Sequence, residues 1–381
     1  MKTGTNTKIS RAIRTAHICE KDEKKAATEF YTALAQPDIE LVIFFCSGEY
    51  NLPVLAREIK RLFAGVQVAG CTTSGEIGYE GYQTHSLAGA SLPRDKFLAV
   101  CGVLENLSRF NSARCPGMIE SLMQRIMSKS AAISELNTFA FMMIDGLSSR
   151  EESIARALQA GLGKIKLLGG SAGSCIYYDG RFYADSVLVV LVSTPLPFSV
   201  FKTQHFISSR KRMLVTEADP AKRTVSEING RPAAGEYARL LGLEAEDLTP
   251  AIFAASPVLA QIKGTSFVRS IQKAEPDGSL LFSCAIEEGM LLRLAHSVDL
   301  LHNLEETFEN IHASIGQPEL VLGCECVLRS SEILETAQNY PVAELFRHNN
   351  TLAFSSHGEQ FLGIQANQTF TGIAIGAEQK I

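Results

Sequence analysis

Two turns rich in small polar residues carry the side chains best suited to bind a ligand. The first is CTTSGEIG, in which Thr72, Thr73 and Ser74 follow Cys71. Its backbone N–H groups and hydroxyls could hold a small polar ligand, although a plain tight turn at a strand end explains the same residues. The turn matches neither G-x-x-x-x-G-K-[ST] nor G-x-G-x-x-G, so we do not expect a nucleotide phosphate site.

The second turn, GGSAG at 169–173, matches the G-x-S-x-G nucleophile elbow of serine hydrolases. In that elbow a helix must follow the serine, whereas the residues after GGSAG are SCIYYDGRFY, a pattern typical of a hairpin. We therefore do not expect a hydrolase site. Ser171 joins Thr72, Thr73 and Ser74 as a candidate ligand-binding residue.

Cysteine and histidine give weaker indications of a metal site. Cys324 and Cys326 lie two apart on an expected strand and so share a face, which supplies half of a zinc or iron–sulfur site. No second cysteine pair lies nearby at metal spacing, and two small buried side chains are the favoured explanation. The eight histidines form no H-x-x-x-H or H-E-x-x-H pair, which argues against a multi-histidine site. A single axial ligand to haem needs no such spacing.

Both polar turns end a similar run of strand, helix and strand. LVIFFCSG, a helix from Pro53 to about Ala64, and VQVAG precede the first turn; TFAFMMIDG, SSREESIARALQAGLG and IKLLGG precede the second. Placing residues 68–70 over 168–170 aligns CTTSG with SAGSC and indicates a weak internal duplication. Two such units are expected to share one sheet system. In this alignment the counterpart of Cys71 is Ser171, so the paired cysteines of duplicated racemases are not reproduced.

Turn signals divide the chain further. Ser148 with Glu151, or Ser149 with Glu152, predicts a capping box for the second helix. The turns DP at 219–220 and NGRP at 229–232 predict a boundary between domains 1–233 and 234–381. We expect an α/β and α+β fold in two domains: an N-terminal domain with duplicated strand-helix-strand units, and a small C-terminal α+β sheet domain of the sensory kind.

Composition excludes several classes of protein. The chain has 381 residues, a net charge of -5 and no run of Lys or Arg, which argues against nucleic acid or an anionic membrane as the main partner. The N-terminus has no apolar signal-peptide core, and no apolar run approaches the roughly 18 residues of a membrane span. Nine scattered cysteines fit reduced thiols, so we expect a cytoplasmic protein.

These segments together resemble the FIST family of sensory proteins. The stretches that carry the resemblance are FFCSGEYNLPVLAREIKRLF, VAGCTTSGEIGYEGY, LLGGSAG, VTEADPAKRTVSEINGRPAAGEYARLLG, GCECVLR and GEQFLGIQANQTFTGIAIG. The first of them, with FKTQHF and CECVLR, is most similar to the nitric-oxide-sensing haemoproteins of the NosP type. The resemblance implies a non-enzymatic sensor with a haem b cofactor, which regulates a histidine kinase, a diguanylate cyclase or a cyclic-di-GMP phosphodiesterase.

The haem that this resemblance implies needs an axial histidine, and His205 is the first candidate. It lies in the expected strand FKTQHFIS just before the domain boundary, where cofactor pockets often form. His85 and His357 are the competitors. Related sequences often carry histidine two residues before the closing Asn-Gln-Thr, where this chain has Gln365.

The alternative to a haem sensor is a haem-free module that binds a metabolite. In that case the ligand is expected near the first polar turn and the loop formed by Asn367, Gln368 and Thr369. A Soret absorption band on the purified protein distinguishes the two functions.

Overall fold

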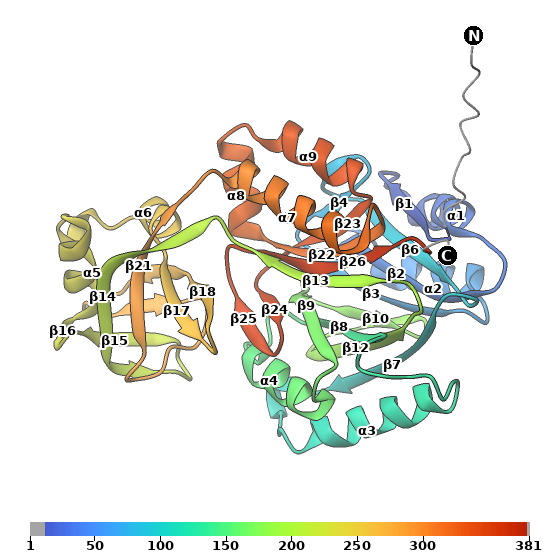
Figure 1. Ribbon diagram of the computed structural model, residues 1–381, viewed down its shortest axis with the longest axis horizontal. Coiled ribbons are helices and arrows are strands. Elements are labelled where there is room, and N and C mark those ends of the chain that lie inside the picture. The colour runs from blue at the N-terminus through green and yellow to red at the C-terminus, as the bar shows by residue number, and fades with distance from the viewer. Residues whose placement is uncertain (1–11, 379–381) are drawn as a thin grey trace, which may run out of the picture.

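The computed structural model describes residues 12–378 and consists of a large and a small domain (Figure 1). Residues 206–297 form the small domain, around one eight-stranded sheet, and the rest of the described chain forms three six-stranded sheets. The chain crosses between the domains only near residues 203–206 and 297–300. Strands and helices mix throughout, which confirms the expected two-domain α/β and α+β class.

The large domain contains three copies of one structural repeat, and the small domain is inserted into the third. Each copy runs edge strand, helix, strand, helix, strand, hairpin, strand, except that two helices stand in place of the second helix in the third copy. The first is β1 (Arg14–Ile18), α1 (Glu23–Leu34), β2 (Ile39–Ser47), α2 (Leu52–Leu62), β3 (Gln67–Thr73), β4 (Glu76–Gly78), β5 (Gly81–Gln83) and β6 (Leu87–Pro93). The second is β7 (Leu98–Glu105), α3 (Arg114–Met127), β8 (Thr138–Ile144), α4 (Glu151–Leu162), β9 (Lys166–Ser171), β10 (Ile176–Tyr178), β11 (Arg181–Tyr183) and β12 (Ser186–Ser193).

The third copy is β13 (Phe198–Thr203), α7 (Leu300–Ile315), β22 (Pro318–Cys326), α8 (Val327–Glu335), α9 (Asn339–His348), β23 (Thr351–Ser356), β24 (Glu359–Phe361), β25 (Ile364–Ala366) and β26 (Phe370–Gly376). Its insert, the small domain, is β14 (Phe206–Asp219), β15 (Thr224–Ile228), β16 (Arg231–Pro232), α5 (Ala233–Leu241), α6 (Pro250–Ala255), β17 (Val258–Ile262), β18 (Thr265–Arg269), β19 (Ile271–Ala274), β20 (Leu280–Phe282) and β21 (Leu291–Ser297). The boundary expected between 233 and 234 falls inside this insert, near the start of α5.

The three repeats exchange their hairpins in a ring. Hairpin β10–β11 pairs with β3 of the first repeat, β24–β25 with β9 of the second, and β4–β5 with β23 of the third. Each six-stranded sheet therefore ends in a hairpin from another repeat. The two duplicated units form separate sheets within one sheet system, because the exchanged hairpin β10–β11 of the second unit extends the sheet of the first.

The backbone register corrects the alignment of the polar turns by one residue. The N–H groups of Thr72, Ser171 and Ser355 donate to the carbonyl oxygens of Cys175, Gly358 and Gly75, at 2.9, 2.8 and 2.8 Å. These three residues therefore occupy equivalent places. The counterpart of Cys71 is Gly170, because each pairs with the first residue of the incoming hairpin. The prediction that Ser171 matches Cys71 is wrong.

The inner faces of the three sheets meet in one core, and the helices cover their outer faces (Figure 1). Phe45, Phe141 and Phe354, one from each repeat, lie in this core. Separate apolar clusters lie under α1 and α2, under α3 and α4, and under α7 to α9. This arrangement follows from the amphipathic pattern of the helices, whose apolar stripes need a sheet to cover.

Several local expectations are corrected. The prediction of a capping box for α4 is wrong, because the N-cap residue is Arg150 and no side chain caps the helix. The strand expected around His205 is interrupted there, between β13 and β14. Among the described residues, no helix is long and apolar enough to cross a membrane.

Candidate functional site

The three polar turns converge, as their equivalence requires. Ser74 Oγ and His357 Nε2 lie 2.9 Å apart, although they are far apart in sequence. Thr72 has a structural role, because its Oγ1 accepts hydrogen bonds from the N–H groups of Ser174 and Cys175, both at 3.0 Å. Ser74 is exposed, whereas Thr72 is buried. Of the first turn, only Ser74 therefore presents a hydroxyl to solvent.

Two further candidate residues hold buried carboxylates. Thr73 donates to Glu76, and Thr369 donates to Glu359 at 2.7 Å. Both glutamates are fully buried, and burial raises the pKa of Glu76 to about 7 and that of Glu359 well above its usual range. Glu359 Oε1 has no hydrogen-bond partner in the part of the chain described. The hydroxyls of Thr73 and Thr369 therefore bind buried carboxylates inside the turns.

The three exchanged hairpins differ at one pair of facing positions. The cross-strand pair is Ile77 with Tyr82 in the first hairpin, Tyr177 with Phe182 in the second, and Gln360 with Gln365 in the third. Ile77 and the Tyr177 and Phe182 rings pack into apolar clusters. Gln360 and Gln365 are 0% and 2% exposed, yet neither side-chain oxygen has a hydrogen-bond partner within the described chain.

The unpartnered amide oxygens lie close to the start of α4. Hairpin β24–β25 contacts α4, and Gln360 Nε2 donates to Ser171 Oγ at 3.3 Å. Asn367 Oδ1, two residues beyond Gln365, is also buried without a partner. An unsatisfied buried polar atom costs about 1–3 kcal/mol, so two of them in one hairpin and a third just beyond it are costly unless something binds them.

A cavity of about 550 Å³ opens beside this hairpin, between the two domains. It is lined by Glu152, Arg156 and Gln159 of α4, by Lys263 and Arg269 of the small domain, and by Gln365, among others. Arg269 is 3% exposed, and its Nε has no hydrogen-bond partner among the described residues. Charges of both signs therefore surround a cavity whose wall contains an unused donor and an unused acceptor.

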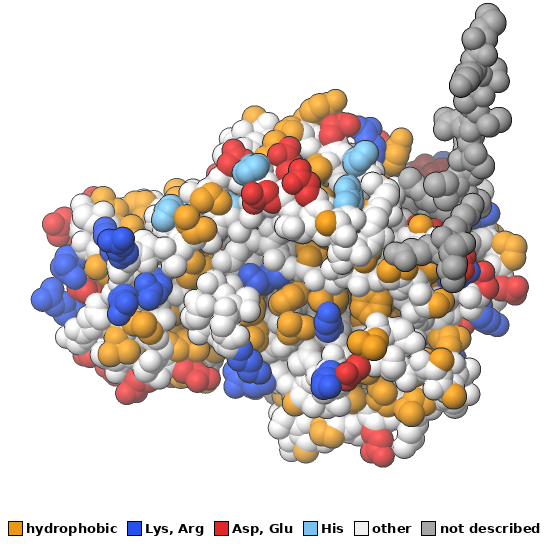
Figure 2. All heavy atoms as spheres, in the orientation of Figure 1, with side chains coloured by type: hydrophobic (Ala, Val, Ile, Leu, Met, Phe, Trp, Pro, Cys, Tyr) orange, Lys and Arg blue, Asp and Glu red, His pale blue; other side chains and the backbone are white. Residues whose placement is uncertain are grey.

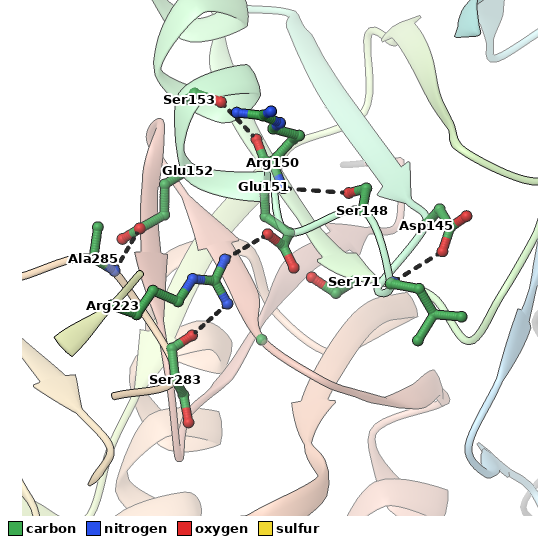
Figure 3. Close-up of polar contacts among 12 residues, drawn as sticks. Asp145, Ser148, Arg150, Glu151, Glu152, Ser153, Ser171, Arg223, Ser283 and Ala285 are labelled. Atoms are coloured by element: carbon green, nitrogen blue, oxygen red, sulfur yellow. Dashed lines mark hydrogen bonds and ion pairs between the residues drawn. The ribbon is translucent and has the colours of Figure 1, made fainter. Parts of the chain in front are cut away.

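The domains are joined around this cavity by hydrogen bonds and ion pairs. Figure 3 shows Arg223 reaching from the small domain to Glu151 at the start of α4. The Arg223 Nη2–Glu151 Oε2 distance is 2.8 Å. Beside it Glu152 Oε2 accepts from Ala285 N at 2.7 Å. Burial raises the pKa of Glu151, although the Arg223 guanidinium opposes the shift. A change in the position of the small domain would therefore also change the geometry of the cavity.

The closing loop provides the other contacts between domains. Arg269 Nη1 donates to the carbonyl oxygen of Gln365 at 2.8 Å. The amide of Gln368 accepts from Ser270 Oγ at 3.1 Å and donates to the carbonyl oxygen of Ala254 at 2.8 Å. Of the expected loop residues, Gln368 therefore holds the small domain, and Asn367 lies beside the unpartnered hairpin amides.

Two of the three candidate haem ligands, His205 and His85, have ring nitrogens that are buried or engaged by other side chains. His205 is fully buried, and both ring nitrogens are engaged, Nδ1 with Arg329 Nη1 at 2.9 Å and Nε2 with Glu332 Oε1 at 3.0 Å. His85 Nδ1 lies 3.2 Å from Glu49, while its Nε2 is buried without a partner. His357 is exposed and contacts Ser74. Neither the cavity at α4 nor a second one beside His17 is lined by any of the three candidates.

The candidate metal cysteines are buried, at 0% and 2% exposure for Cys324 and Cys326. Burial raises the pKa of both thiols, which disfavours the thiolate form that binds metal. Within residues 12–378 no group of three or more His, Cys, Asp or Glu is placed to hold a metal ion.

Sequence comparison identifies the family of this two-domain architecture. The model of the FIST N domain matches residues 40–231, and that of the FIST C domain matches residues 233–362. The chain belongs to the FIST family. FIST domains are signal-transduction sensor modules, and the junction of the two matches lies within the small domain.

Other comparisons add little to this assignment. No curated protein matches the chain. A solved cyanuric acid hydrolase, described as an evolutionary innovation by structural concatenation, is similar with a TM-score of 0.34 and 11% identity, over 96% of this chain and 99% of that one. The hydrolase from A. caulinodans gives 0.34 and 10%, over the same shares. Similarity at this level carries no argument about function.

Sequence reasoning missed the hairpin glutamines and Arg269 as site residues. Gln365 stood out only as a departure from the family pattern. A signal for the pair was present, because two polar residues occupy positions that are apolar or aromatic in the other two hairpins. Comparing the three hairpins requires that the third repeat be recognised, and the inserted small domain separates the first strand of that repeat from the rest of it.

Proposed function

We propose that this FIST protein senses a small zwitterionic ligand of amino-acid size, bound between hairpin β24–β25, α4 and the small domain. The observation that carries the proposal is the buried pair Gln360 and Gln365, which replaces apolar packing with unpartnered amide oxygens. An ammonium group satisfies such oxygens, and the free Nε–H of Arg269 suits a carboxylate.

Binding would change the relative position of the domains. The ligand would share Arg269 with its present partner, the carbonyl oxygen of Gln365, which is one of the contacts that dock the small domain. A ligand that prefers one arrangement shifts the population toward it. We propose that the protein has no catalytic activity of its own, acts in the cytoplasm, and passes this change to a sensor histidine kinase, a diguanylate cyclase or a phosphodiesterase.

The test is thermal unfolding and calorimetric titration with a panel of free L-amino acids. At least one should stabilise the protein, because a ligand that binds only the folded state raises its stability. Replacing Gln365→Leu or Arg269→Gln should weaken that binding by about tenfold or more, which is about 1.4 kcal/mol. The control is Gln83→Leu in the first hairpin. A panel without any effect, or equal binding by Gln365→Leu, would overturn the proposal.

Haem-based sensing of nitric oxide is the second proposal, and it rests on the NosP-like sequence segments. Of the three candidate ligands, His357 is the one with an exposed ring. Protein expressed with a haem supply would then carry roughly one haem per chain and show a Soret band that shifts with nitric oxide. Colourless protein that takes up no added hemin would rule this function out, and a His357→Ala variant with a native spectrum would exclude that ligand.

A further inference from the structure

The outer face of the small-domain sheet displays cations and leucines side by side. Arg212 lies directly opposite Arg293 on the neighbouring strands β14 and β21, and Leu214 lies directly opposite Leu291. Alternation along a strand puts these four side chains on one face, and we call them the Arg-Leu patch. Leu214 and Leu291 are 44% and 46% exposed. Figure 2 shows Lys and Arg side chains gathered over the small domain.

The arrangement is unfavourable for the isolated chain. Like charges directly opposite each other on paired strands destabilise a sheet, and exposed leucines gain nothing from packing. The ion pairs within the small domain use other cations, namely Lys222, Arg231, Arg239 and Lys273. Within the described chain neither arginine of the patch has a carboxylate partner. A binding partner would compensate for both features.

The geometry selects the kind of partner. β21 is paired on both sides, with β14 and β17, whereas at Arg212 and Leu214 β14 is paired only with β21, because its pairing with β15 begins at Val215. A strand added to the open edge of β14 would lie two strand spacings, about 10 Å, from β21. A partner that contacts all four side chains of the patch therefore lies across the face of the two strands. Side chains two apart on a strand are about 7 Å apart, and neighbouring strands are about 5 Å apart, a spacing that one turn of a helix matches.

We propose that the Arg-Leu patch docks an amphipathic helix of a partner protein, with carboxylates against Arg212 and Arg293 and apolar side chains against Leu214 and Leu291. Charge complementarity favours this occupant, because the patch offers two unpaired cations on a chain whose net charge is -5. Nucleic acid would leave the leucines unused and meets a protein of the same sign of net charge.

The patch also adjoins the proposed ligand cavity. A groove of about 370 Å³ beside the patch is lined by Leu259, Gln261, Leu291 and Arg293. Ile262 and Met290 line both this groove and the cavity at α4. Ligand binding on one side of these two residues would therefore alter the docking surface on the other, a coupling that rests on the proposed function.

The test uses three labelled helical peptides in fluorescence polarisation: one with Glu and Leu on a single face, one with Lys in place of Glu, and one with Ser in place of Leu. Only the first should bind tightly. Arg212→Glu with Arg293→Glu should weaken its binding by about tenfold or more. The matched control is Lys24→Glu with Lys25→Glu, which reverses two exposed charges on α1.

Three results would overturn the proposal: equal binding by the reversed variant, equal binding of the Ser peptide, or displacement of the first peptide by a DNA duplex. A single Arg212→Glu variant guards against misfolding, because Glu opposite Arg293 is a favourable pair. Amino-acid binding by the reversed variant reports on the ligand site separately, so failure of docking and failure of the proposed function can be distinguished.

Discussion

At the scale of single residues, the buried glutamine pair contradicts what packing alone requires. The equivalent pairs in the other hairpins are Ile77 with Tyr82 and Tyr177 with Phe182. Replacing Gln360→Ile together with Gln365→Leu should raise the free energy of unfolding by about 1–3 kcal/mol, because unsatisfied buried oxygens are removed. The same variant should lose the response to ligand. Urea unfolding and calorimetry measure the two effects, and a destabilised variant with intact binding contradicts the assignment.

A second residue-scale prediction concerns His17, whose Nε2 lies 3.1 Å from Ser86 Oγ, which in turn donates to Glu76. Burial lowers the pKa of His17 to about 4. The unfolded chain therefore binds a proton first as the pH falls below about 6.5, and stability is lost between pH 6.5 and 4. The loss is at most about 3 kcal/mol, reduced by partial exposure.

Replacing His17→Gln should make the free energy of unfolding less sensitive to acid in this window. Glu76 acts in the opposite direction, because its pKa is raised to about 7 and its contribution is lost as the pH rises from 4.5 through 7. The exposed His302→Gln is the control. An unchanged pH profile in His17→Gln would show that His17 does not account for the acid sensitivity.

At the scale of elements, the contact of hairpin β24–β25 with α4 decides whether the cavity wall is in place. The turn of the hairpin contains Gly363, with φ of +78°, and a Cβ there would lie 2.6 Å from Gln159 Cβ on α4. Gly363→Ala must therefore displace the hairpin or the helix. Gly264 has a φ of +82° and no atom within 4 Å of its Cβ position.

Both alanine variants carry the strain of a left-handed residue, about 1 kcal/mol, but only Gly363→Ala adds a steric clash. We expect Gly363→Ala to unfold at a distinctly lower temperature than Gly264→Ala and to bind ligand more weakly. Thermal unfolding of the matched pair measures the difference. Equal melting temperatures would show that the hairpin is not held against α4.

At the scale of the whole molecule, Arg223 and Glu151 hold the two domains together. Their side chains are 19% and 5% exposed, so removing the cation leaves a buried carboxylate without a partner. Arg223→Ala should destabilise the docked arrangement by about 3–5 kcal/mol. Small-angle scattering should report a larger radius of gyration, and proteolysis should increase near 203–206 and 297–300.

The neighbouring exposed Lys222→Ala is the control, and adding Glu151→Gln to Arg223→Ala should restore part of the stability by removing the buried charge. The pKa of Glu151, already raised by burial, rises further without Arg223. Its contribution is then present at low pH and lost as the pH rises through the raised pKa, so the variant should be more compact in acid. An unchanged radius at neutral pH would show that this pair does not dock the domains.

The sequence by itself determined the local elements and the family. The helices expected from Pro53 to about Ala64 and within SSREESIARALQAGLG correspond to α2 and α4, because apolar periodicity and turn residues act within a few positions. The same local reasoning paired Ser171 with Cys71, since small residues align equally well at neighbouring offsets. It also found only two repeats, because the insert at 206–297 separates the first strand of the third repeat from the rest.

Only the tertiary structure decided which residues form a site. Hairpin exchange brings β24–β25 onto the second repeat, so Gln365 lies beside α4 and Arg269 although no local pattern connects them. Tertiary contacts likewise decide the surroundings of His205, because Arg329 and Glu332, more than a hundred residues away, occupy both ring nitrogens. Periodicity records which face of an element is apolar. It does not record which distant element covers that face, because long-range contacts form between segments whose sequences are independent of each other.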